Sequence, residues 1–248
     1  MTSTPPPAWC EHGPGQHDGG VPSHASAPEA SRAWLLIEYD GLWAEQAVAT
    51  PLPGGLGKLA VAADELGIRV QLIRRVDRAA REAGGRVFAA WTDDPEPWLA
   101  DVTSAAGSGA STSGSGNGNG TAGAGLDLTA LAAGERPASG IPVERMYLVC
   151  VHGRRNRCCA RFGGLLARAL APDYQDELWE TTHVGGHKFA ANLVLLPHGH
   201  YYGPCDASTA RAAIGAYDRG AVLPGRYRGR AGQSVAAQQT EYAALTAG

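Results

Sequence analysis

Residues 145–151, Arg-Met-Tyr-Leu-Val-Cys-Val, form a short apolar run in the second half of the chain. A run of this length and composition is typical of a buried β-strand. Residues 162–171 follow with apolar positions at helical spacing, and residues 177–182 with a second strand pattern. A strand, a helix and another strand in this order predict the βαβ unit of an α/β fold.

The same order of elements is found on both sides of this unit. Further strands are expected at 192–197 and from 201, and a closing helix at 207–219. The first half repeats the order with a strand at 34–39, a helix at 56–67 and strands at 69–76 and 86–92. Both halves therefore read as βαβ followed by a hairpin. This order predicts an α/β fold of two thioredoxin-like lobes (βαβ-ββα), the second carrying the candidate site.

Composition divides the chain into four parts. Residues 1–31 are rich in Pro, Gly, Ser and His and predict a flexible tail. Residues 104–125 are Gly/Ser low complexity and predict a flexible linker, because such a segment buries too little to offset its ordering entropy. We therefore expect a degenerate lobe at 32–103, without cysteine or histidine ligands, and a ferredoxin-like lobe at 126–248.

The overall composition narrows the function classes. Hydrophobic residues make up 44% of the 248 residues and charged residues 18%, as in soluble globular proteins. A net charge of −3 argues against nucleic acid as a partner. No apolar run is long enough to span a membrane, and the N-terminus lacks a secretory pattern, so a cytoplasmic location is expected. Five cysteines, three of them within residues 150–159, favour metal binding or catalysis over a disulfide framework.

Cys150 stands at the carboxyl end of a predicted strand, where α/β proteins bind their ligands. The loop after it contains three arginines that would favour thiolates or the charge of a thiolate-bound cluster. They are Arg154, Arg155 and Arg157. Cys158 and Cys159 follow directly. Adjacent side chains diverge, so one of the two is expected to be a ligand, and spacing leaves both open.

His183 and His187 form an H-x3-H pattern with Gly185 and Gly186 between them. The glycines argue against a helix, and the Glu of a zinc-protease helix is missing, so a loop around a compact cofactor is expected. Two thiolates and two imidazoles suit tetrahedral zinc and also a [2Fe–2S] cluster. Spacing does not separate these two cofactors.

Other functions find less support in the residues. A thiol–disulfide oxidoreductase using Cys158 and Cys159 lacks the Cys-x-x-Cys pattern. A glycoside hydrolase needs two facing carboxylates, and no pattern pairs the candidates Glu38, Asp40, Asp93, Asp94 and Glu180. A binding module without metal is the remaining alternative. Cys10, in the predicted tail, is expected to be incidental.

The motifs resemble the sucrase/ferredoxin-like family of thioredoxin-like ferredoxins. They are Cys150-Val-His-Gly-Arg-Arg-Asn-Arg-Cys-Cys, Trp179-Glu-Thr-Thr-His-Val-Gly-Gly-His-Lys-Phe and Tyr202-Gly203. The resemblance implies a [2Fe–2S] cluster bound by Cys150, Cys159, His183 and His187, with Cys158 as the alternative to Cys159. Asn156 departs from the family pattern because an aspartate is usual there, and Cys205 lies outside the motifs.

The resemblance implies a one-electron carrier more than an enzyme with its own substrate. An imidazole donates less charge than a thiolate, so its ligation raises the reduction potential; His-ligated Rieske centres span about −150 to +300 mV, against about −400 mV for plant-type ferredoxins. The second nitrogen of each imidazole can carry a proton, which predicts a pH-dependent potential. Arg154, Arg155 and Arg157 would tune it. The expected partner is a redox protein; neither its identity nor the oligomeric state follows from the sequence.

Overall fold

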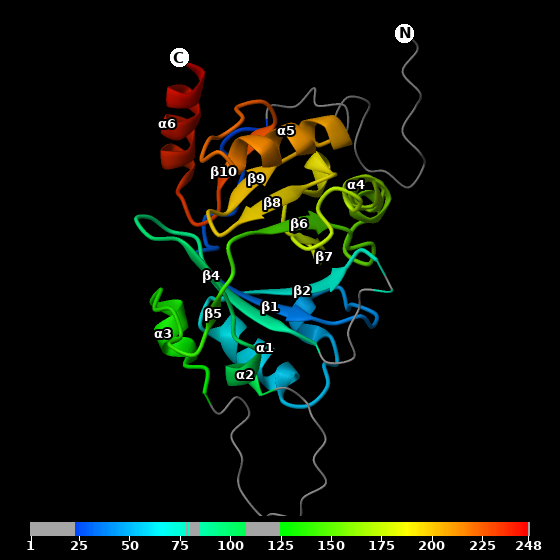
Figure 1. Cartoon of the computed structure of the whole chain (residues 1–248), viewed down its shortest axis with the longest axis vertical. Helices are drawn as coiled ribbons and strands as arrows, with labels where there is room; N and C mark the ends of the chain where they lie inside the picture. The colour runs from blue at the N-terminus through cyan, green and yellow to red at the C-terminus, as the bar shows by residue number, and fades with distance from the viewer. Residues whose placement is uncertain (1–22, 78, 80–84, 108–124, 248) are drawn as a thin grey trace, which may run out of the picture.

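A computed structural model describes residues 23–77, 79, 85–107 and 125–247. Ten strands of this part form one curled, mixed sheet in the order β10-β9-β8-β6-β7-β2-β1-β3-β4-β5 (Figure 1). The strands are β1 (Ala33–Glu38), β2 (Arg69–Arg75), β3 (Val87–Trp91), β4 (Trp98–Asp101), β5 (Ile141–Pro142), β6 (Met146–Cys150), β7 (Leu178–Thr181), β8 (Leu193–Leu196), β9 (His200–Tyr202) and β10 (Tyr227–Arg230).

Six α-helices and three shorter helical segments accompany the sheet in the described residues. The helices are α1 (Leu56–Glu65), α2 (Thr103–Ala106), α3 (Leu128–Ala132), α4 (Gly164–Leu170), α5 (Ala207–Tyr217) and α6 (Val235–Thr246). The short segments are the 3₁₀ turn η1 (Ala47–Ala49), the π-helical turn η3 (Cys159–Gly163) and the 3₁₀ turn η4 (His187–Phe189). No helix among the described residues combines the length and the apolar character of a membrane span.

The two halves of the sheet have the same topology. In the second half β6 pairs parallel with β7 and antiparallel with β8, which pairs with β9. In the first half β1 pairs parallel with β2 and antiparallel with β3, which pairs with β4. An antiparallel pairing of β2 with β7 joins them, with Arg74 opposite Glu180. The α/β class is thus confirmed, and one sheet spans both predicted lobes.

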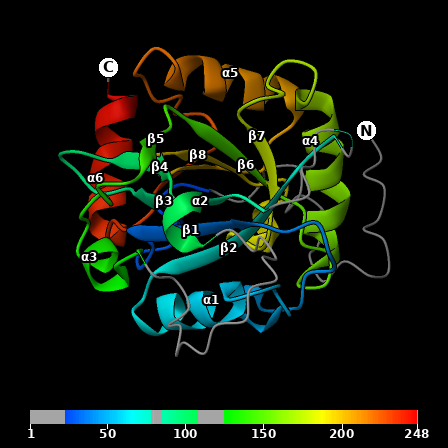
Figure 2. The ribbon, with the colours of Figure 1, turned by 60° about the horizontal axis from the view of Figure 1, so that its bottom comes forward.

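The two faces of the sheet are covered differently. One face packs on α1, α4 and α5 and forms a core that includes Leu35, Val149 and Leu195. Because the sheet is curled, helices on this one face lie at opposite ends of the molecule in Figure 2, with α1 below the strands and α5 above them. The opposite face has a separate core that includes Trp34, Trp179 and Tyr201. Cys150 and Cys159 belong to this second core, so the candidate ligands lie on the face away from the three helices.

The strand and helix patterns with strong apolar periodicity are confirmed, and weaker ones were missed. No sequence pattern indicates β4, β5, β10 or α6. In β10, Tyr-Arg-Gly-Arg, two arginines and a glycine hide the pattern, although three of its four residues are buried. In α6 the one buried residue is Gln238, so no apolar stripe marks the helix.

The predicted tail and linker lie largely outside the described residues. Residues 23–31 of the tail are described, and they pack against β10: the amides of Ser26 and Ala27 both donate to the Arg228 carbonyl. The amide of Ala27 also donates to the Gln238 side chain in α6. In the linker, residues 108–124 are outside the described part. The domain boundaries stay predictions.

Candidate metal centre

The candidate ligands meet where two neighbouring strands end. Cys150 is the last residue of β6 and pairs with Thr181, the last residue of the parallel strand β7. His183 follows Thr181 by two residues, so the register brings it to the same edge as Cys150. This is the carboxyl edge of the strands, where the following loops converge.

Three donor atoms lie close together at this edge. The Nδ1 atom of His183 is 4.0 Å from the Cys150 sulfur and 3.7 Å from the Cys159 sulfur. The ligand atoms of all three residues are within 4.8 Å of one another. Both cysteines are fully buried and His183 is partly exposed. Two sulfurs and an imidazole nitrogen in this arrangement could hold a metal ion.

Cys159 belongs to this group of donors, and Cys158 does not. Cys159 begins η3, the π-helical turn that leads into α4. The Asn156 side chain accepts a hydrogen bond of 2.9 Å from the Cys158 amide just before this turn. The same segment packs tightly on β6, because a Cβ at Gly163 would collide with the Cys150 carbonyl. Because neighbouring side chains diverge, Cys158 faces elsewhere, although it is buried as well.

His187 lies on the same loop as His183 but outside the three-donor group. The two rings are 6.1 Å apart between centroids and tilted by 39°. Gly185 and Gly186 have φ angles of +96° and +69°, in the left-handed region that glycine adopts without strain. The loop predicted between the histidines is present, and Gly186 precedes the short 3₁₀ turn η4 that starts at His187.

The separation of His187 from the other donors distinguishes two kinds of site. Four ligands on one zinc ion, with bonds of about 2.0–2.3 Å, would lie about 3.3–3.8 Å from one another. The first three donors approach this spacing, and His187 is outside the group. A [2Fe–2S] cluster divides its ligands between two irons and accommodates a wider set. The donor set therefore fits a two-iron cluster with four ligands, or a zinc ion with three ligands and an open position.

The two neighbouring thiols shift each other's pKa in opposite directions. A hydrogen bond from the Cys159 thiol, together with the nearby His183 imidazole, lowers the pKa of Cys150 well below its usual value despite burial. The hydrogen bond to Cys150, together with burial, raises the pKa of Cys159. A lowered pKa favours the thiolate form of Cys150, which is the form that binds metals.

His152 links His183 to the first half of the molecule. Its Nδ1 accepts a hydrogen bond of 3.2 Å from the His183 amide, and its Nε2 lies 2.8 Å from the Ala44 carbonyl. Burial lowers the pKa of His152, which favours the neutral ring that these two bonds require. From β2, Arg69 and Gln71 donate to the His183 carbonyl at 3.2 and 3.3 Å. The first half of the molecule, which contributes no candidate ligand, therefore holds the backbone of the candidate ligand His183 in place.

Arg228 holds the loop between His183 and His187 in place through hydrogen bonds. It lies in β10 and is only 1% exposed. Its guanidinium donates to the Asn192 side chain at 2.7 Å, the Ser26 carbonyl at 2.6 Å and the Gly185 carbonyl at 3.2 Å. A Cβ at Gly186 would collide with the guanidinium, so that position requires glycine for space as well as for conformation.

The charge of Arg228 lies close to the candidate ligands. Burial lowers the pKa of Arg228 to about 10, and the negative charge of the Cys150 thiolate acts in the opposite direction. The side chain is therefore a cation at neutral pH. Its bonds to Ser26, Gly185 and Asn192 all use neutral acceptors, so its charge is available to offset negative charge at the thiolates.

The three arginines predicted as electrostatic tuners are exposed on the loop after β6. Arg155 forms an ion pair of 2.9 Å with Glu45 of the first half.

Cys205 is buried in a groove away from the donor group, and burial raises the pKa of its thiol to about 12. Cys10 lies outside the described residues. Three of the five carboxylates that a glycoside hydrolase site would need to draw on form ion pairs with arginines: Asp93 with Arg32, Asp94 with Arg230 and Glu180 with Arg74.

Sequence reasoning missed the residues that hold the ligands in place. His152 carried a signal, since it lies two residues after Cys150 within the recognised motif. Gln71 and Arg69 read as ordinary strand residues, and Arg228 lies in an unpredicted strand. Their roles depend on contacts between segments that are more than 30 residues apart in the chain.

Fold and site together define a mixed α/β protein with two cysteines and a histidine that could bind metal. The family model described as sucrase/ferredoxin-like matches residues 59–229, more than half of the chain. The chain therefore belongs to the sucrase/ferredoxin-like family, as its motifs predicted. No curated protein and no solved structure gives a significant match.

Proposed function

We propose that the chain binds a [2Fe–2S] cluster through Cys150, Cys159, His183 and His187 and carries single electrons to or from a partner protein. The observation that carries this proposal is the cluster of two sulfurs around His183 Nδ1, with a second histidine on the same loop. The repeated βαβ-ββ topology supports two thioredoxin-like halves, of which the second would hold the cluster. Such a cluster would supply one-electron redox chemistry when bound.

The protein's own residues determine the conditions for that chemistry. Burial of both cysteines keeps water away from the sulfurs, and the partly exposed histidines give a short path to the surface. His183 turns Nδ1 toward the sulfurs, which leaves Nε2 to hold a proton. Its ring lines a pocket of about 300 Å³ together with His152, Arg155 and residues of the first half, a route for that proton.

The test is spectroscopy and metal analysis of protein purified without oxygen. We expect visible absorption, an EPR signal after one-electron reduction, and about two irons and two sulfides per chain. His183→Cys and His187→Cys are expected to keep a cluster with a lower potential, because thiolate replaces imidazole. Protein that holds one zinc per chain and has no visible absorption would contradict the proposal.

Proton coupling is tested on the same sample. If an imidazole nitrogen releases its proton on oxidation, the midpoint potential falls with pH by up to about 59 mV per unit. A potential that is constant from about pH 6 to pH 10 would remove this part of the proposal.

Zinc is the second candidate, supported by a specific observation. Cys150, Cys159 and His183 alone form a three-ligand set, which matches catalytic zinc sites with an open fourth position. The metal analysis separates the two candidates.

A further inference from the structure

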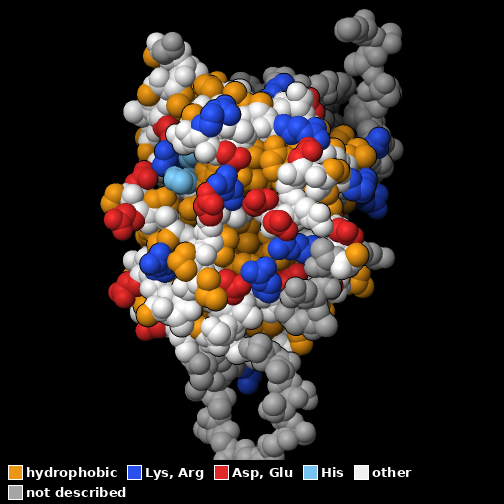
Figure 3. Space-filling view, in the orientation of Figure 1, with side chains coloured by type: hydrophobic (Ala, Val, Ile, Leu, Met, Phe, Trp, Pro, Cys, Tyr) orange, Lys and Arg blue, Asp and Glu red, His pale blue; other side chains and the backbone are white. Residues whose placement is uncertain are grey.

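Two arginines lie on the inner face of the curled sheet, and neither has a carboxylate partner among the described residues. On the surface, by contrast, Lys and Arg side chains lie among Asp and Glu side chains (Figure 3), and several form ion pairs, such as Arg145 with Asp218. Arg69 donates to a serine hydroxyl and a backbone carbonyl, and all the acceptors of Arg228 are neutral as well. The positive charge of both guanidinium groups is therefore not neutralised by a carboxylate in this part of the protein.

Tyr201 lies next to these two arginines and is fully buried. Its ring packs against Trp34 at 6.5 Å between centroids, although four strands separate β9 from β1 in the sheet. The Arg69 guanidinium lies 5.1 Å from the centroid of the Trp34 ring, and the Arg228 guanidinium lies 5.4 Å from that of the Tyr201 ring. Because the sheet curls, side chains from β1, β2, β9 and β10 thus form one compact group inside it.

Two donor groups in this interior have no hydrogen-bond acceptor among residues 23–77, 79, 85–107 and 125–247. They are the Tyr201 hydroxyl and the Arg69 Nε–H, and both atoms are shielded from solvent. Nearly all buried polar groups in folded proteins have a partner, because a donor without one loses its hydration and gains nothing in return. Two such donors in one group therefore indicate an acceptor that a bound group supplies.

The candidate metal centre faces the same side of the sheet. Tyr201 pairs with Val194 of β8, and Val194 pairs with Leu148 of β6. Side chains alternate along a strand, so Cys150, two residues after Leu148, faces the same side as Tyr201. Tyr201, Cys150 and Cys159 accordingly belong to one buried core.

Electrostatic effects connect the same side chains with Cys150. Burial raises the pKa of the Tyr201 hydroxyl, the charges of Arg69 and Arg228 lower it, and the charge of Cys150 raises it. Burial lowers the pKa of Arg228, and the charge of Cys150 raises it. The hydroxyl therefore keeps its proton at neutral pH and is a donor within electrostatic reach of the Cys150 sulfur.

We propose that the Tyr201 hydroxyl and the Arg69 Nε–H donate hydrogen bonds to the sulfur atoms of the bound centre and thereby raise its reduction potential. The inference rests on the proposed [2Fe–2S] function and adds two residues, one from each half of the chain, that set the potential. Hydrogen bonds to the sulfur atoms are among the features that determine the potentials of iron–sulfur clusters. A donor stabilises the sulfur atoms more when they carry the charge of an added electron, so it favours the reduced form.

The first test is the midpoint potential of the cluster-loaded full chain. Tyr201→Phe removes only the hydroxyl group. A hydrogen bond to a charged acceptor changes an equilibrium constant by about tenfold or more. Tyr201→Phe should therefore favour the oxidised form about tenfold, which lowers the potential of a one-electron couple by about 59 mV. The matched control is Tyr202→Phe, because Tyr202 belongs to the opposite core and its hydroxyl accepts from the Leu223 amide; its potential should equal that of the wild type.

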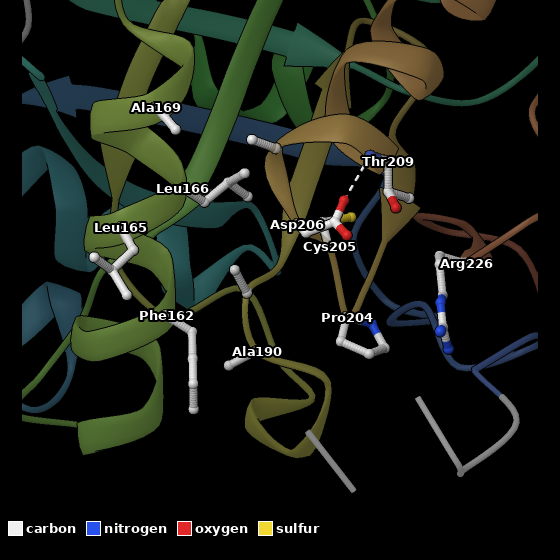
Figure 4. A pocket seen from close by; sticks show the side chains of 12 residues that line it. Phe162, Leu165, Leu166, Ala169, Ala190, Pro204, Cys205, Asp206, Thr209 and Arg226 are labelled. Atoms are coloured by element: carbon white, nitrogen blue, oxygen red, sulfur yellow. Dashed lines mark hydrogen bonds between the residues drawn. The ribbon is translucent and has the colours of Figure 1, made fainter. Parts of the chain in front are cut away.

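Arg69→Lys separates the hydrogen bond from the charge. Lysine keeps the positive charge but has no guanidinium Nε–H, so the potential of this variant should also fall. The control is Arg226→Lys, since Arg226 lines the groove of about 450 Å³ between α4 and the start of α5, together with Cys205 (Figure 4). The potential of the control should not change.

The hydrogen bond also has a vibrational signature. Resonance Raman spectra of protein loaded in H2O and in D2O should differ in the iron–sulfur stretching frequencies, because exchangeable protons are bonded to the sulfur atoms. Backbone N–H groups contribute to this difference in every variant. Tyr201→Phe should therefore lose part of the deuterium shift, and Tyr202→Phe should keep all of it.

Urea unfolding of the metal-free protein tests the hydroxyl itself. Tyr201→Phe removes a buried donor that has no acceptor in the described structure, so the metal-free variant should be at least as stable as the wild type. A less stable metal-free variant would show that the hydroxyl has a protein partner and would overturn the proposal. An unchanged potential together with an unchanged deuterium shift in Tyr201→Phe would overturn it too. A wild type that binds zinc and no iron contradicts the proposed function itself, before any variant is compared.

Discussion

The His152 side chain accepts a hydrogen bond from the backbone amide of His183 across 3.2 Å. His152 in turn contacts the Ala44 carbonyl, and its ring meets Trp43 edge-on at 5.9 Å. The first half of the molecule thus reaches the candidate ligand through one imidazole. This gives the half that lacks ligands a structural role at the metal centre.

Replacement of His152 should therefore weaken metal retention. His152→Phe keeps the packing on Trp43 but removes both hydrogen bonds, so the His183 backbone loses its support. Loss of a residue that holds a ligand typically reduces metal affinity about 10- to 100-fold. The measurement is the rate of metal loss to a chelator. His152→Asn, which keeps an acceptor near the Nδ1 position, is the control, and equal loss from both variants would contradict this role.

The vicinal cysteines should behave differently. Cys150→Ser and Cys159→Ser are expected to abolish stable metal binding, because each removes a sulfur of the three-donor group. Cys158→Ser should keep the metal, since its sulfur is outside that group, and Cys205→Ser serves as a second buried control. Metal content per purified chain provides the measurement. Loss of the metal from Cys158→Ser and its retention in Cys159→Ser would reverse the assignment.

Arg228→Met should lower both stability and potential. The substitution leaves the acceptors on Ser26, Gly185 and Asn192 without their donor, which costs about 1–3 kcal/mol of unfolding free energy per group left unpaired. It also removes a buried cation near Cys150, so an added electron is less stabilised and the midpoint potential falls. Urea unfolding and redox titration measure the two effects. The exposed Arg219→Met is the control. An unchanged midpoint potential in Arg228→Met would show that the buried charge does not affect the potential of the centre.

Gly186→Ala separates steric collision from backbone strain. Gly186 and Gly67 have similar φ angles, +69° and +75°, but a Cβ meets Arg228 at Gly186 and nothing within 4 Å at Gly67. Gly67→Ala should cost about 1–2 kcal/mol of unfolding free energy from the left-handed backbone alone. Gly186→Ala should cost more and should also reduce metal retention, because the histidine loop must shift. Equal unfolding free energies for the two variants would mean that the loop accommodates the methyl group.

His200 should make the protein sensitive to acid. It is 4% exposed among Tyr217 and Tyr227, and neither ring nitrogen has a hydrogen-bond partner in the part of the chain that the structure describes. Burial lowers its pKa to about 3, below the ordinary 6.5. The unfolded chain therefore takes up this proton first as the pH falls, and the folded state loses about 1.4 kcal/mol per pH unit between about 6.5 and 3.

His200→Phe fills the same space with a ring that does not titrate. The acid loss of stability should become correspondingly shallower, measured as the unfolding free energy in urea at a series of pH values. An identical pH profile in wild type and variant would assign the acid sensitivity to other groups.

The α/β class, the strands and helices with strong apolar periodicity, the candidate ligands and the family can all be predicted from the amino-acid sequence. These features are local: a strand of buried residues or a cysteine near several arginines is visible in a few neighbouring residues. Motifs such as Cys150-Val-His and His183-Val-Gly-Gly-His also concentrate the chemistry in short segments.

Which of these groups come together depends on contacts between segments that are distant in the chain. Adjacent cysteines are equivalent by spacing, and the turn at the start of η3 brings Cys159 rather than Cys158 to Cys150 and His183. The parallel register of β6 and β7 aligns Cys150 with the strand that precedes His183. The β2–β7 pairing brings Arg69 and Gln71 to the His183 carbonyl, and β10 brings Arg228 to the histidine loop. These contacts join segments that are distant in the sequence. No local pattern predicts them, because the sequence around a polar strand residue does not indicate which distant group it will contact.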